Sequence, residues 1–187
     1  MVRDFSSCVR LLQADDWVAA VCNSHDTEAV REILVRCAEI MLPYWEARFD
    51  KVDSMSRLIN AMHRFSSIPT AETQGALKAL IPMNRFPRTL PTHPGIIFEC
   101  LPEKNGSDCP ADFAGDAIAY AALALVDSDA STYSANVGSA LEASIEAIAR
   151  LFAERDTNDE SKVDHYSNAK SHIRKRLLEN RSASHAV

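Results

Sequence analysis

Apolar side chains recur every three or four residues along most of this chain, and this periodicity constrains the fold more than any other feature. The repeat is clearest between residues 26 and 44, where its members are Val30, Ile33, Leu34, Cys37, Ile40, Met41 and Tyr44. Such spacing places apolar side chains on one face of an α-helix. Only five glycines occur in 187 residues, and residues that favour helices are frequent. The sequence therefore predicts an all-α fold.

The same pattern predicts further helices, which gives a single-domain bundle of about six to seven helices over residues 1–180. We expect these helices at residues 5–22, 54–65, 71–80, 112–126, 131–154 and from the polar break at 156–159 to about 180. Asp15 and Asp16 interrupt the first stripe, and Pro43 predicts a kink, or an end and a restart at Tyr44. The last helix is expected to make contacts through Val163, Tyr166, Ile173 and Leu177. Residues 181–187 are expected to form a frayed tail.

Residues 81–110 separate the two halves of this pattern and contain six of the eight prolines. Proline lacks a backbone donor and does not fit inside a helix, so the segment predicts a long proline-rich connection. A connection of this length inside a compact domain is usually functional or disordered. Its Arg85, Phe86 and Arg88 are candidate partner anchors.

The cellular setting is constrained by charge placement and by the cysteines. Asp4, Asp15 and Asp16 break any apolar run near the start, so no secretory segment is expected there. The longest apolar stretch is residues 117–126, whereas a membrane span needs about 20 residues. Five scattered cysteines, an odd number without zinc-ligand spacing, are consistent with a reducing compartment. We expect a cytoplasmic protein with no membrane association.

The sequence contains none of the strong catalytic or nucleotide-binding motifs, such as GxSxG, HExxH or a P-loop. His165 and His172 share a helix face but lie about 10 Å apart along the axis, too far for one metal ion. We therefore expect no enzyme, no metal and no cofactor. An alternative is an enzyme in which Glu39 and Glu46, seven residues apart on one helix, bind a metal with partners elsewhere.

The charge distribution indicates where a partner could bind. Six acids and no lysine or arginine lie between residues 112 and 146; they are Asp112, Asp116, Asp127, Asp129, Glu142 and Glu146. A surface of this sign attracts basic partners and repels nucleic acid, although a merely solvated face is equally consistent with it. The last helix is basic, but the chain as a whole has a formal net charge of −6, so we expect no nucleic-acid partner.

A short segment also carries a family resemblance. Residues 35–46, which read VRCAEIMLPYWE, resemble the "CAE…LP.(F/W)E" stretch of helical immunity proteins of bacterial polymorphic toxin systems, loosely the Imm5-like group. Alanine-rich later helices, such as residues 114–124 here, are similar to that group as well. The resemblance covers about twelve residues and implies a cytoplasmic protein that binds a cognate toxin.

Two functions follow as hypotheses. The first is an immunity protein that neutralises a secreted toxin, such as a nuclease, by occluding its active site through the six acids and the anchors named above. The toxin would be basic at the contact surface. The alternative is a helical adaptor or regulatory module that binds another protein without catalysis.

Overall fold

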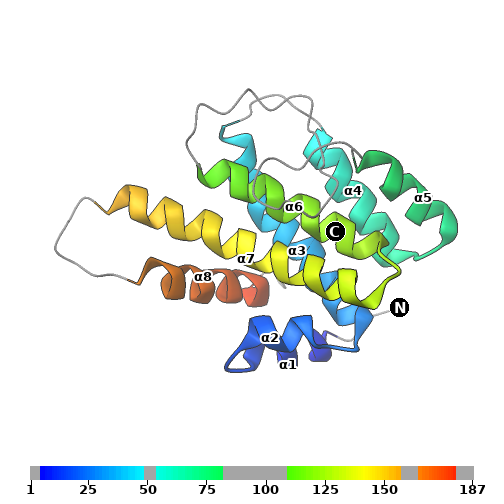
Figure 1. The fold of residues 1–187 in the computed structure, drawn as a ribbon, viewed down its shortest axis with the longest axis horizontal. Coiled ribbons are helices and arrows are strands. Elements are labelled where there is room, and N and C mark those ends of the chain that lie inside the picture. The colour runs from blue at the N-terminus through cyan, green and yellow to red at the C-terminus, as the bar shows by residue number, and fades with distance from the viewer. Residues whose placement is uncertain (1–4, 49–53, 82–108, 157–163, 180–187) are drawn as a thin grey trace.

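The computed structural model describes residues 5–48, 54–81, 109–156 and 164–179, and its regular secondary structure is entirely helical (Figure 1). The helices are α1 (Ser6–Gln13), α2 (Trp17–Cys22), α3 (Thr27–Glu46), α4 (Ser54–Ser67), α5 (Ala71–Leu80), α6 (Pro110–Val126), α7 (Ala130–Arg155) and α8 (His165–Glu179). The predicted all-α class is confirmed. Most of the expected connection, residues 82–108, and the expected frayed tail lie outside the described residues.

Eight helices are described where six or seven were expected, because the first stripe divides into α1 and α2. Asp16 caps the second of them, with its Oδ1 accepting a hydrogen bond from the Ala19 amide at 3.5 Å. An aspartate that accepts from a backbone amide in this way favours a new helix start over continuation. Asp15 and Asp16, which interrupt the apolar stripe, therefore lie at the boundary between α1 and α2.

Helix α3 begins at an aspartate cap and runs on through its proline. Asp26 Oδ1 accepts a hydrogen bond from the Ala29 amide at 3.0 Å. The helix continues past Pro43 to Glu46, so the expected alternative of an end and a restart at Tyr44 is wrong. Pro43 is exposed and lies in the last turn, where water can replace the hydrogen bond that its ring removes.

Helix α6 forms the centre of the core, against α3 on one side and α7 on the other (Figure 1). Twelve of its seventeen residues are buried, and seven of the seventeen are alanine. Small side chains allow helices to approach closely. At Gly115, α6 packs tightly against α3: a Cβ added there would lie 3.0 Å from Trp45 Cδ1. None of the described helices has both the length and the apolar character to cross a bilayer.

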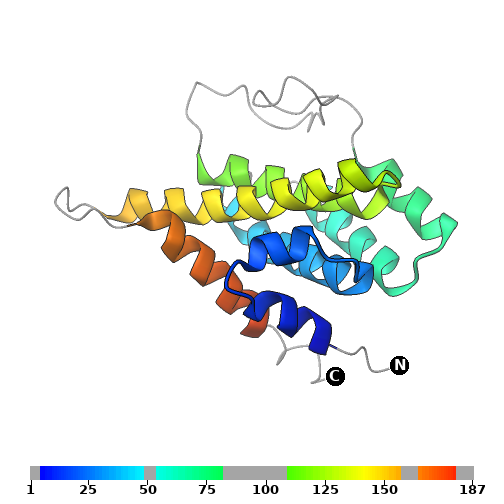
Figure 2. The same cartoon turned by 60° about the horizontal axis from the view of Figure 1, so that its bottom comes forward.

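Helix α8 packs on α7 and α3, and α1 and α2 lie beside it (Figure 2). The predicted contacts Ile173 and Leu177 are confirmed as buried, together with Ala169. Tyr166, another predicted contact, is partly exposed, at 45%. It stands in the first turn of α8, beyond the buried stripe. Val163 lies outside the described residues.

Arg36 makes contacts that connect three of these helices. Its Nε donates to Glu32 Oε1 at 2.8 Å within α3, and its Nη1 donates to the Leu177 carbonyl of α8 at 3.5 Å. Its guanidinium also stands 4.3 Å from the ring centroid of Phe5, at the start of α1. The guanidinium therefore joins α1, α3 and α8 at a point where the side chain is only 14% exposed.

The buried thiols lead to a prediction about reactivity. Burial raises the pKa of Cys8 to about 11 and that of Cys37 to about 12. Because the thiolate is the reactive form, iodoacetamide at pH 8 should leave both residues unmodified in the folded protein and modify them after denaturation. Mass spectrometry of the peptides measures this directly. Rapid labelling of Cys37 in the folded protein would contradict its placement in the core.

Candidate partner-binding surfaces

The six acids identified from the sequence do not form one face. Asp112 is only 8% exposed and caps the start of α6, where its Oδ2 accepts a hydrogen bond from the Cys109 amide at 3.3 Å. Asp116 is half-buried, and its charge adds to the effect of burial in raising the pKa of Tyr120 to about 12. Asp112 therefore serves the helix start and is not available to a partner.

Asp127 and Asp129 organise the turn between α6 and α7. Asp127 accepts hydrogen bonds from the Asp129 amide at 3.1 Å and from Asn136 Nδ2 at 3.2 Å. Asp129 caps α7 by accepting from the Thr132 amide at 2.9 Å. Hydrogen bonds from Ser131 and Thr132 lower the pKa of Asp129 to about 2. Both carboxylates line a cleft of about 390 Å³ in which Arg31 of α3 is also present.

Glu142 and Glu146 lie one turn apart on α7 and face the start of α8. Burial and then the charges of Glu142, Glu146 and Asp16 raise the pKa of Tyr166, while the charge of Lys170 lowers it. Glu146 Oε1 accepts a hydrogen bond from Arg150 Nε at 2.7 Å, and Asp16 Oδ1 accepts one from Lys170 Nζ at 2.9 Å. We call Asp16, Glu142, Glu146 and Tyr166 the acidic tyrosine patch.

The remaining sequence candidates fall elsewhere. Arg85, Phe86 and Arg88 lie outside the described residues. Glu39 and Glu46, the alternative metal-binding pair, are each engaged by α4: His63 Nε2 stands 2.8 Å from Glu39 Oε1, and Ser56 Oγ donates to Glu46 Oε1 at 3.2 Å. Within the described part of the chain, no group of three His, Cys, Asp or Glu side chains is arranged to hold a metal ion.

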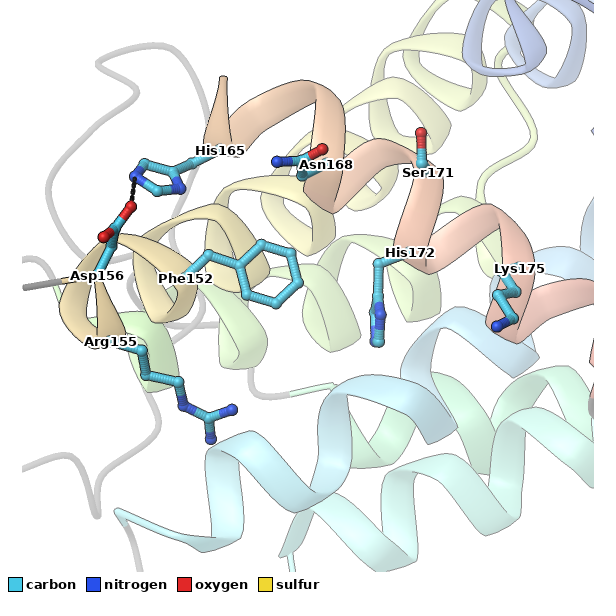
Figure 3. A pocket seen from close by; sticks show the side chains of 8 residues that line it. All are labelled: Phe152, Arg155, Asp156, His165, Asn168, Ser171, His172 and Lys175. Atoms are coloured by element: carbon cyan, nitrogen blue, oxygen red, sulfur yellow. Dashed lines mark ion pairs between the residues drawn. The ribbon is translucent and has the colours of Figure 1, made fainter. Parts of the chain in front are cut away.

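A second surface, not identified from the sequence, lies between the end of α7 and α8 (Figure 3). This α7–α8 groove has a volume of about 640 Å³; it is lined by Phe152, Arg155, Asp156, His165, Asn168, Ser171, His172 and Lys175. The rings of Phe152 and His172 meet edge to face, with centroids 5.7 Å apart. His165 Nε2 stands 3.8 Å from Asp156 Oδ2 at one end of the groove.

Most residues that line the groove are of polar types, and they include two cations, Arg155 and Lys175, and one acid, Asp156. Burial lowers the pKa of His172, and the charges of Arg176 and Lys175 lower it further, so this ring is mainly neutral at pH 7. The signal in the sequence is the spacing of three, four and three residues between His165, Asn168, His172 and Lys175. That spacing places four polar side chains on one flank of α8, whereas the sequence pattern drew attention to the two histidines alone.

The segment that carries the family resemblance lies in the second half of α3, largely in the core. Six of its residues are at most 4% exposed: Val35, Cys37, Ala38, Ile40, Met41 and Trp45. The segment therefore specifies how α3 packs and contributes little surface to a partner. Comparisons with protein families, with curated proteins and with solved structures find no match to this chain.

Proposed function

We propose that this chain is a non-catalytic protein-binding domain, an immunity protein that neutralises a cognate bacterial toxin in the cytoplasm by occluding its active site. The acidic tyrosine patch is the observation that carries the proposal. Tyr166 is one of two large apolar or aromatic residues exposed among the described residues, and three carboxylates act on its hydroxyl. Partly exposed tyrosines are frequent anchors at protein interfaces.

The chemistry of the patch favours a basic partner. Glu142 is exposed and has no ion pair among the described residues, while Asp16 and Glu146 each have one. An arginine from a partner could form a two-pronged hydrogen bond with the Glu142 carboxylate and lie over the Tyr166 ring. A nuclease uses arginine and lysine to hold phosphates, so an acidic surface would compete for that site.

Co-expression with the protein encoded by the adjacent gene tests the proposal. The wild-type chain should rescue growth and copurify with that protein at an equimolar ratio. Tyr166→Ala should weaken binding by about 30-fold or more, as expected for an interface hot spot worth about 2 kcal/mol. Glu142→Lys should weaken it at least about tenfold, because attraction is replaced by repulsion.

Glu154→Lys is the matched control. Glu154 is an exposed glutamate on the same helix, about 18 Å along the axis from Glu142, and a cation there suits the carboxyl end of α7. The affinity of the Glu154→Lys variant for the toxin should stay within about twofold of wild type, because screened charges at this distance interact weakly. A stable complex that does not protect growth would favour the adaptor function. Unchanged binding by both patch variants would exclude the patch.

A further inference from the structure

The side chains of the α7–α8 groove form a cationic site that the proposed function does not use. Arg155 at the end of α7 and Lys175 on α8 are both exposed, with one carboxylate, Asp156, among the lining residues. That carboxylate is beside His165, and Glu179, one turn from Lys175 on the same face of α8, is 3.6 Å from Lys175 Nζ. Arg155 therefore has no anionic partner among the described residues, and Lys175 has one only in an exposed pair, which contributes little stability and which a ligand of higher charge can replace.

The groove also offers an apolar surface beside these cations. Figure 3 shows the Phe152 ring directed toward His172, with Arg155 to one side of this pair and Lys175 to the other. Phe152 is half-buried, so part of its ring is open to the groove. A ligand that fits both features carries an anionic group joined to a carbon skeleton or ring.

We propose that the α7–α8 groove binds a small organic phosphate, with the phosphate group held by Arg155, His172 and Lys175 and its carbon portion against Phe152. These three donors come from two helices and line the same groove from different sides. A phosphate monoester has nearly two negative charges and three acceptor oxygens, so it can satisfy donors placed in this way. A carboxylate is planar with a single charge and suits one arginine fork better. The site is independent of the acidic tyrosine patch, which lies on the opposite flank of α8.

Phenyl phosphate is the probe, added to the full chain and followed by calorimetry and by NMR of the histidine rings. We expect saturable binding with a Kd on the order of 1 mM or tighter. The His172 resonances should move, and those of exposed His25 should not. Inorganic phosphate, which lacks the ring, should bind more weakly at the same site. Phe152→Leu should weaken phenyl phosphate but leave inorganic phosphate unchanged.

Variants of the two exposed cations decide whether the groove is the site. Arg155→Gln with Lys175→Gln should reduce affinity for phenyl phosphate at least about tenfold, because two charge-assisted hydrogen bonds are lost. Lys78 is an exposed lysine on α5, and Lys78→Gln is the matched control. Its affinity for phenyl phosphate should stay within about twofold of wild type. The Glu142→Lys variant should bind the probe like wild type, which separates this site from the patch.

Three results would overturn the proposal. They are no saturable binding of phenyl phosphate, wild-type affinity in the Arg155 and Lys175 double variant, or equal affinity for benzoate. The last result would identify a carboxylate site in place of a phosphate site.

Discussion

Replacing Trp45 with alanine is expected to lower the free energy of unfolding by about 3–5 kcal/mol, the range for a large aromatic removed from a packed core. Trp45 is 1% exposed and faces Gly115 of α6, so its loss leaves a cavity between α3 and α6. Urea unfolding followed by circular dichroism measures the change. A loss below about 1 kcal/mol would mean that Trp45 does not fill this space.

The contact between Trp45 and Gly115 can be tested from the glycine side. In Gly115→Ala the new Cβ would lie 3.0 Å from Trp45 Cδ1 and 3.2 Å from Nε1. The indole is rigid, so overpacking of about 1–3 kcal/mol should outweigh the gain of about 1 kcal/mol in helix propensity. Gly75→Ala on α5 is the matched control, since no atom lies within 4 Å of its added Cβ. That variant should be more stable than wild type by about 0.5–1 kcal/mol.

A double variant makes this test specific. Trp45→Ala removes the indole atoms that the added methyl group would meet, so Gly115→Ala should be less harmful in the Trp45→Ala background than in wild type. The expected coupling between the two changes is about 1 kcal/mol or more. Additive effects would show that the two residues are not in contact.

Replacing Arg36 with methionine is expected to cost about 2–3 kcal/mol of stability, because a largely buried guanidinium with charged and aromatic partners is lost. Methionine keeps the apolar length of the side chain while it removes the charge. Glu32 then loses the hydrogen bond from Arg36 Nε in a place where its side chain is only 23% exposed. Unfolding in urea gives the magnitude, and a double variant with Phe5→Leu isolates the ring contact.

Arg150→Met is the matched control for Arg36. Arg150 makes the same two kinds of contact, a 2.7 Å bond to Glu146 and a 4.5 Å approach to the Phe113 ring, but its side chain is 38% exposed. Solvent screening reduces the worth of such a pair, so we expect a loss of about 1 kcal/mol or less. Equal losses at the two sites would show that burial does not strengthen the Arg36 contacts.

The sequence predicts the helices well because their periodicity is a local property. It places α3, α5 and α7 within about two residues of their observed ends. It also predicts a start of α6 at Asp112, although the helix begins at Pro110 after the Cys109 cap. Proline suits the first position of a helix, which is why the boundary lies two residues earlier. The pattern therefore assigns Asp112 to the surface, whereas the structure shows a buried capping residue.

The candidate surfaces are harder to predict because they depend on how helices are rotated against each other. A run of acids counts charges along the chain, but successive turns of a helix point in different directions. The charges of Glu142 and Glu146 therefore act on Tyr166 of α8, while Asp127 and Asp129 lie at the α6–α7 turn. The groove escapes prediction because only the packing of α8 on α7 brings His172 beside Phe152. The spacing of residues along the sequence alone predicts neither the acidic tyrosine patch nor the α7–α8 groove.

The alanines of α6 bear on how the bundle can tolerate a helix buried on nearly all sides. An alanine has no side-chain rotamers to lose, whereas ordering a longer buried side chain costs up to about 2 kcal/mol. Seven of the seventeen residues of α6 therefore enter the core without this entropic penalty. The same feature leaves little freedom for repair, because a larger side chain there cannot swing aside and must displace α3 or α7. Variation in this protein should consequently accumulate on α5 and on the outer face of α8, and spare α6.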